Sequence, residues 1–157
     1  MHFYASVGFY CAYVLSAICL LTVRMCKGTH HMDSQRYNIQ VSVESHYIEK
    51  ESDPAQSRFV FAYTVTLVNH GTVAAKLLTR HWIISDAEGQ VQEVRGEGVV
   101  GEQPYLRPGE GFRYTSGTIL DTPLGVMQGA YQMLADDGEY FDAPIAPFRL
   151  VDPKILH

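Results

Sequence analysis

From Tyr37 onward, apolar and polar side chains alternate along the chain at the period of a β-strand. Over residues 37–43 every second side chain is apolar and those between are polar, which predicts a strand with one buried face. Residues 59–68 carry aromatic and β-branched side chains at both sets of alternating positions, which predicts a central strand covered on at least one side. The polar residues 49–57, with Pro54 among them, are predicted to connect these two strands.

The rest of the chain contains shorter runs of the same kind. Further strands are predicted over residues 74–85, 90–95, 112–114, 127–133 and 140–151. Between them lie turns rich in glycine, proline and acidic residues, at 86–89, 107–110, 122–125 and 136–139. Pro144 and Pro147 remove two backbone donors from the last run, so this strand is expected at a sheet edge or in two pieces.

This spacing predicts an all-β fold. About seven strands with turns every eight to fourteen residues are typical of an antiparallel β-sandwich of immunoglobulin-like size. Ten of the 13 glycines lie between Gly89 and Gly138, which leaves no room there for a helix of ordinary length. Tyr131 is expected as a corner tyrosine bonded to upstream backbone. We expect the core to hold Val41, Phe61, Tyr63, Val65, Trp82, Phe112, Tyr131 and Phe148.

The beginning of the chain follows a different pattern. The segment from Phe3 to Val23 carries no charge and is long enough to cross a bilayer as a helix, and Arg24 and Lys27 follow it. We therefore divide the chain into an apolar N-terminal extension that is helical or disordered, residues 1–31, and a β-sandwich domain, residues 32–157.

Three interpretations of the extension stay open. It is a membrane anchor with the domain on the cytoplasmic side, a cleaved secretory signal, or a stretch upstream of a true start at Met32. The signal is disfavoured because no basic residue precedes Phe3 and no small-residue cleavage site ends the apolar run. The mis-assigned start is favoured, since Met32 opens what looks like an ordinary soluble N-terminus.

Charge and cysteine content narrow the class of protein further. Residues 32–157 carry ten basic and 17 acidic side chains, so a broad basic face for nucleic acid is not expected. The cysteines Cys11, Cys19 and Cys26 all lie in the extension, whereas a small secreted sandwich would often hold a disulfide. We expect a cytoplasmic domain, or one anchored on the cytoplasmic side if residues 3–23 span a membrane.

The stretch from Gly96 to Gly101 matches the G-x-G-x-x-G pattern of dinucleotide-binding folds. In those folds a helix follows the glycines, and its N-terminal amides bind the pyrophosphate. Here the chain continues toward Pro104 without a helical pattern, and Glu97 and Glu102 would repel a phosphate. We interpret the motif as a tight, glycine-rich crossing at a sheet edge. The candidate residues for ligand or partner binding are Gly96, Glu97, Gly98 and Gly101.

The domain offers little for metal binding or nucleophilic catalysis. Its histidines do not have metal-ligand spacing, and no domain cysteine accompanies them. Asp136, Asp137 and Glu139 are hard-oxygen ligands close in sequence, but we interpret them as the solvated acids of a hairpin turn. No G-x-S-x-G motif is present. We expect no cofactor, no metal and no catalytic residue.

Several blocks of the sequence follow one another in a characteristic order. They are the glycine stretch 96–101, Pro-Gly-Glu at 108–110, Tyr-Thr-Ser-Gly at 114–117 and the run 122–133, with further fits at 59–65, 80–82 and 147–150. In this order they resemble the ApaG family of bacterial proteins. The resemblance covers about residues 37–157 and implies a fibronectin type III-like sandwich. Members of that family begin close to the position of Met32, so the extension departs from the family.

The resemblance implies no settled activity. The family is linked by name to cobalt resistance and magnesium efflux. Its glycine motif has been proposed as a pyrophosphate site, which the missing helix and the two glutamates disfavour here. Related domains in F-box proteins and in a polymerase-interacting protein look like protein-binding modules. A soluble sandwich cannot itself conduct ions through a bilayer. We therefore expect a non-enzymatic protein-interaction module, which meets an unidentified protein or a second copy in a homodimer. The alternative is a small-ligand or divalent-cation-responsive regulator.

Overall fold

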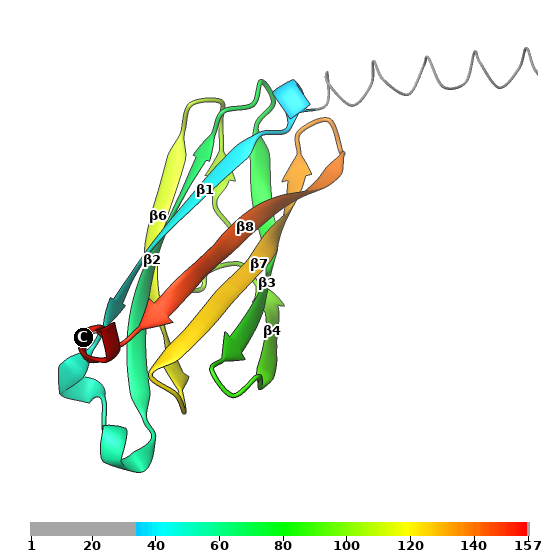
Figure 1. Cartoon of the computed structure of the whole chain (residues 1–157). Helices are drawn as coiled ribbons and strands as arrows, with labels where there is room; N and C mark the ends of the chain where they lie inside the picture. The colour runs from blue at the N-terminus through cyan, green and yellow to red at the C-terminus, as the bar shows by residue number, and fades with distance from the viewer. Residues whose placement is uncertain (1–33, 157) are drawn as a thin grey trace, which may run out of the picture. The chain divides into compact units, whose positions relative to one another are not determined.

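The structure is a computed structural model that describes residues 34–156. The predictions made for the extension, residues 1–31, concern residues outside this range. Within it, eight strands follow one another with three short 3₁₀ helices (Figure 1). The strands are β1 (Ile39–Tyr47), β2 (Phe59–Asn69), β3 (Ala75–Asp86), β4 (Val91–Glu97), β5 (Tyr105–Leu106), β6 (Gly111–Leu120), β7 (Leu124–Ala135) and β8 (Tyr140–Val151). The 3₁₀ helices are η1 (Glu49–Glu51), η2 (Pro54–Gln56) and η3 (Pro153–Leu156).

The strands form two antiparallel sheets, which confirms the predicted β-sandwich. One sheet has the order β1-β2-β6, and the other has the order β4-β3-β7-β8 with the two-residue β5 also paired to β3. The central position predicted for residues 59–68 is confirmed, since β2 lies between β1 and β6. The edge position predicted for residues 140–151 is also confirmed. That strand is continuous and not in two pieces. Its pairing with β7 shifts register once, between Met127 and Gly129.

The two sheets are joined along one side and separate along the other. β1 and β8 contact each other, and the Ser45 hydroxyl donates a 2.7 Å hydrogen bond to the carbonyl of Arg149 across that side. Counting from this closed side, β6 is the third strand of its sheet and β4 is the fourth strand of the other. β6 and β4 are therefore the edge strands of the open side (Figure 1).

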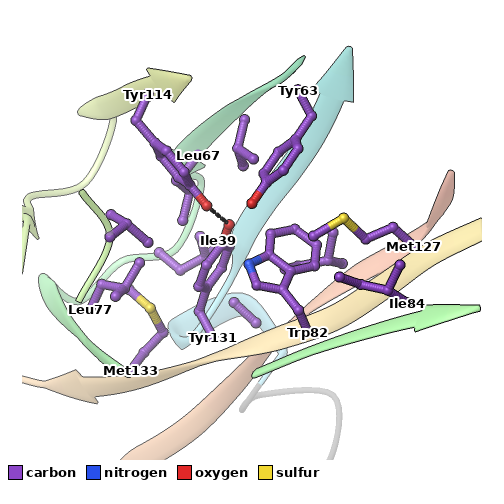
Figure 2. Close-up of a cluster of buried hydrophobic side chains, with 14 of the residues drawn as sticks. Ile39, Tyr63, Leu67, Leu77, Trp82, Ile84, Tyr114, Met127, Tyr131 and Met133 are labelled. Carbon is purple, nitrogen blue, oxygen red and sulfur yellow. Dashed lines mark hydrogen bonds between the residues drawn. The ribbon is translucent and has the colours of Figure 1, made fainter. Parts of the chain in front are cut away.

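Aromatic side chains fill the space between the sheets. Trp82 from β3 meets Tyr63 from β2 with ring centroids 5.5 Å apart, and meets Tyr131 from β7 at 6.1 Å, both edge to face. The predicted core members Phe61, Tyr63, Val65, Trp82 and Tyr131 are buried, whereas Val41, Phe112 and Phe148 are partly buried and pack against this cluster. Figure 2 shows how Trp82 and three tyrosines from the two sheets converge: Tyr63, Tyr114 and Tyr131.

Two buried tyrosines share a hydrogen bond across the sandwich. The hydroxyls of Tyr114 on β6 and Tyr131 on β7 are 2.5 Å apart (Figure 2). The expectation that Tyr131 bonds to upstream backbone is therefore wrong, because its hydroxyl reaches a side chain of the facing sheet. Burial raises the pKa of Tyr114 to about 12 and raises the pKa of Tyr131 further. Burial disfavours the charged phenolate, so both hydroxyls stay neutral at neutral pH.

A search for membrane-spanning helices bears only on the described part of the chain. Within residues 34–156 no helix has the length and apolar character needed to cross a bilayer. The apolar run from Phe3 to Val23 lies outside those residues, so its prediction as an anchor is untouched by this finding.

The buried tyrosine pair should make the domain sensitive to alkaline pH. The unfolded-state pKa of tyrosine is about 10, and that of folded Tyr114 is about 12. The stabilisation from its neutral hydroxyl is therefore complete below pH of about 10 and is lost as pH rises toward about 12. The free energy of unfolding should fall by up to about 1.4 kcal/mol per pH unit for each such tyrosine. Urea unfolding at several pH values from about 9 to about 11 measures this loss of stability. In the double variant Tyr114→Phe/Tyr131→Phe the free energy of unfolding should fall less over the same range. An equal loss in both proteins would contradict the assignment.

Candidate functional site

The glycine motif lies where the chain leaves β4. Gly96 and Glu97 are the last two residues of that strand, and Gly98 and Gly101 lie in the turn that follows. We call residues 96–102 the glycine loop. The structure therefore brings the four predicted site residues together in one short segment.

Arg80 on the neighbouring strand β3 holds the base of this loop. Its Nη1 donates hydrogen bonds of 2.8 Å to the carbonyls of Glu97 and Gly98. The guanidinium lies so close to Gly96 that a Cβ there would come within 2.9 Å of it. A side chain at position 96 would therefore have to displace the Arg80 guanidinium from its place beside the loop.

The tip of the glycine loop is a tight two-residue turn. The backbone amide of Val99 donates to the carbonyl of Glu102 at 2.8 Å, and the amide of Glu102 returns the bond at 2.9 Å. The two central residues, Val100 and Gly101, have φ of 45° and 81°, the positive values of a type I′ turn. Glycine and asparagine favour such values, but a β-branched valine rarely adopts them. The turn therefore holds Val100 in a strained backbone conformation.

The turn points one valine into the protein and the other into solvent. Val99 is fully buried in the main hydrophobic cluster, whereas the neighbouring Val100 is 60% exposed. The amide of Gly98 donates to the carbonyl of Leu78 at 2.8 Å, and the Gln103 side chain donates to the same carbonyl at 2.9 Å. Anchored from both sides, the loop presents an apolar side chain on a preformed backbone.

The glycine loop is not arranged as a phosphate cradle. Dinucleotide folds direct free backbone amides and a helix N-terminus at the pyrophosphate. Here the amides of Gly98, Val99 and Glu102 donate to carbonyls of the protein itself. After Glu102 the chain passes to the short strand β5. The carboxylates of Glu97 and Glu102 flank the tip, so the local charge opposes an anion.

The acidic turn between β7 and β8 has a structural role in the described part of the chain. The Asp137 carboxylate accepts hydrogen bonds from the Arg36 guanidinium at 2.6 Å and from the Tyr37 hydroxyl at 2.7 Å. The bond from Tyr37 is the main reason why the pKa of Asp137 is lowered. Asp136 accepts from the Tyr105 hydroxyl at 2.6 Å. These carboxylates therefore fasten β5 and the segment that precedes β1 to the turn.

No metal centre emerges from the described residues. Across residues 34–156, no three His, Cys, Asp or Glu side chains are grouped so that they could hold an ion. His81 instead contacts Glu93 at 3.1 Å, and this bond is the main reason why the pKa of Glu93 is lowered. The pair joins neighbouring strands β3 and β4.

Sequence reasoning missed three contributors to the site. Arg80 supports the loop from another strand, Val99 anchors it, and Val100 is its exposed tip. Spacing along the chain could not indicate Arg80, since the antiparallel pairing of β3 with β4 brings it beside Gly96. The pattern of two valines between glycines was visible, but not which valine faces solvent.

Comparisons with known proteins agree on one family. The family model described as the ApaG domain matches residues 49–135. Protein ApaG of Ectopseudomonas mendocina is 58% identical over 126 residues, which are 80% of this chain and 100% of that protein. Protein ApaG of Thiobacillus denitrificans is 57% identical over 125 residues, 80% of this chain and 98% of that protein. The crystal structure of a Bordetella pertussis protein described as ApaA superposes with a TM-score of 0.75 at 51% identity, covering 76% of this chain and 98% of that one.

Substitutions in the glycine loop should separate backbone strain from contact. A Cβ at Gly98 would lie 2.2 Å from the carbonyl oxygen of Glu102, so Gly98→Ala should destabilise the domain by roughly 2–4 kcal/mol. Gly101→Ala meets nothing within 4 Å and should cost only about 1–2 kcal/mol for its positive φ.

Val100→Gly is the complementary variant. It relieves a left-handed strain of about 1–2 kcal/mol and adds backbone entropy to the unfolded chain worth roughly 0.5–1 kcal/mol, so stability should stay level or rise. Urea unfolding of the three variants gives the order of their free energies of unfolding. A large loss for Val100→Gly would contradict the strained conformation.

Proposed function

The chain belongs to the ApaG domain family, and we propose that it is a non-enzymatic protein-interaction module that uses the glycine loop, residues 96–102, as a contact surface. The observation that carries this proposal is Val100, which is 60% exposed and held at φ 45°. Strained backbone in an otherwise regular fold is concentrated at functional positions. An exposed valine on such a backbone suits contact with another protein.

The rigidity of the loop supports the same function. Binding costs free energy for every segment that must be ordered, so a preformed loop binds more tightly than a flexible one. Arg80 and the buried Val99 hold the glycine loop in place before any partner arrives. The partner surface that suits it offers a small apolar recess for Val100, with basic groups beside it for Glu97 and Glu102.

The alternative of a ligand-responsive or cation-responsive regulator has less support. The amides of Gly98, Val99 and Glu102 in the glycine loop donate to carbonyls of the protein itself, so these three are not free to bind a phosphate. The carboxylates of Asp136 and Asp137 accept hydrogen bonds from tyrosine and arginine side chains. We therefore place protein interaction first, in the cytoplasm, where a domain without cysteine in residues 32–157 needs no disulfide.

The interaction function predicts that charge placed at the loop tip abolishes partner capture. Val100→Asp should remove the apolar contact while its backbone stays tolerant, because aspartate accepts positive φ. The tagged full chain and the variant are used to capture proteins from a lysate of the native cell, and captured proteins are compared by mass spectrometry. At least one partner of the unmodified chain should be lost by the variant.

A matched control separates contact from general surface change. Leu156, at 69% exposed, lies outside the loop, so Leu156→Asp should leave capture unchanged. Calorimetric titration of the unmodified chain with Mg²⁺, Co²⁺, pyrophosphate and ATP tests the alternative. Capture that survives Val100→Asp, or saturable micromolar binding of one of these ligands, would count against the proposed function.

A further inference from the structure

The two layers of the sandwich have unequal widths on the open side. Beyond the closed side at β1 and β8, one sheet ends at its third strand, β6, and the other continues to a fourth, β4. β4 is therefore the extra strand of the wider sheet and extends past β6, and no described strand occupies the position beside the outer edge of β6. We call this position the strand slot.

Side chains of both layers line a cleft at the strand slot. It consists of two adjoining hollows of about 220 and 250 Å³, which share Ile84 and Gln92 in their walls. Ser116, Gly117 and Thr118 of β6 form one wall, and the inward-facing Val94 of β4 forms part of the other. Trp82, the single tryptophan of the chain, contributes to the floor. The cleft therefore follows the second half of β6.

The edge of β6 offers backbone hydrogen bonds to the slot. On β2, the amide of the odd-numbered Asn69 donates to the carbonyl of Glu110, beside β6. The carbonyl of the even-numbered Val60 points the other way and accepts from the amide of Ile48, beside β1. Odd-numbered residues of β2 thus face β6, and their partners in register are the even-numbered residues of β6. The amides and carbonyls of Thr115, Gly117 and Ile119 therefore point away from β2, and no residue of the described chain is seen to bond them. An unpaired edge of this kind accepts another strand.

The slot suits a single strand better than a second copy of the domain. If β6 of another copy paired with this β6, that copy would bring its own second layer beneath its own β6. The space beneath is already taken by β4, since β4 extends past β6. A lone extended segment has no second layer and avoids this collision.

The charges of the cleft select a direction for that segment. Asp86 and Asp121 line the end near Ile119, and no basic side chain is among the residues that line that hollow. Arg80 lines the other hollow, where β6 contributes Ser116. A strand antiparallel to β6 would place its N-terminal residues beside the two carboxylates and its C-terminal residues toward Arg80.

We propose that the strand slot binds an extended peptide segment that pairs antiparallel with β6. The segment carries a basic side chain near its N-terminal end, an acidic one near its C-terminal end, and small apolar side chains on the face between. Those apolar side chains lie opposite Thr118 and Ser116 and pack toward Val94 and Ile84. The slot is a second contact surface that shares Arg80 with the base of the glycine loop, but the exposed tip at Val100 is not part of it.

The test uses a capped peptide of sequence Lys-Thr-Val-Thr-Val-Thr-Glu with the full chain. In the expected register its lysine, valines and glutamate face the cleft, while its threonine amides bond to β6. Binding is followed by the fluorescence of Trp82. Amide hydrogen exchange by NMR supplies the position: the amides of Thr115, Gly117 and Ile119 should exchange at least about ten-fold more slowly with peptide, since each becomes a ladder donor.

Two modified peptides test the pairing itself. N-methylation of the threonines removes the donors that face β6 and should weaken binding at least about ten-fold. N-methylation of the valines alters amides that point away from β6 and should leave affinity within about two-fold. The peptide of reversed sequence should bind at least about ten-fold more weakly, because its charges meet like charges at both ends.

Two protein variants test the cleft. Val94→Glu places a charge under the peptide and should weaken binding at least about ten-fold, while Arg95→Glu, on the opposite face of β4, serves as the matched control. Val100→Asp in the glycine loop should leave peptide affinity unchanged, so failure here is distinguishable from failure of the proposed function. Absence of binding at millimolar peptide, protection of amides elsewhere, equal effects of both N-methylated peptides, or pairing of β6 in a dimer would each overturn the proposal.

Discussion

The contact of Trp82 with Tyr63 and Tyr131 across the sandwich positions the rest of the structure. These rings come from β3, β2 and β7, so they join the inner strands of both sheets, and edge-to-face aromatic packing fixes their relative orientation. The hydroxyls of Tyr131 and Tyr114 add a polar constraint, because each satisfies the other inside an apolar core. The hydrogen bond between Tyr114 and Tyr131 thereby ties β6 to β7 of the facing sheet.

The candidate contact surfaces lie on the segment that crosses between the sheets at that open side. The chain leaves β4 through the glycine loop, adds β5 to the edge of β3 and then enters β6. One sheet edge therefore ends in a rigid turn with Val100 at its tip, and the other offers unpaired backbone along β6. On the closed side the edge strands β1 and β8 contact each other, and the Ser45 hydroxyl bonds to the carbonyl of Arg149.

The glycine loop and the strand slot suit different kinds of recognition. The loop is preformed by Arg80 and Val99, so it favours a partner whose surface already fits an exposed valine and two carboxylates. The slot supplies hydrogen bonds from backbone and a shallow floor at Trp82, so it favours an extended segment whose side chains alternate. The proposed contact at the loop rests on shape and charge, and the one proposed at the slot rests on backbone hydrogen bonds. Both fit the proposal that this domain of the ApaG family acts by contact with proteins.

The local pattern of the sequence was enough to predict the strands, the turns and much of the core. Aromatic and β-branched side chains on both faces of residues 59–68 indicated a central strand, and Pro144 and Pro147 indicated an edge, because both signals act within one strand. Pairing between distant segments decided what the pattern could not show. The partner of the Tyr131 hydroxyl, the placement of Arg80 beneath Gly96 and the extra width of one sheet all depend on which strands become neighbours. Strand order is a property of the whole packed chain, so the open edge at β6 became visible only in the tertiary structure.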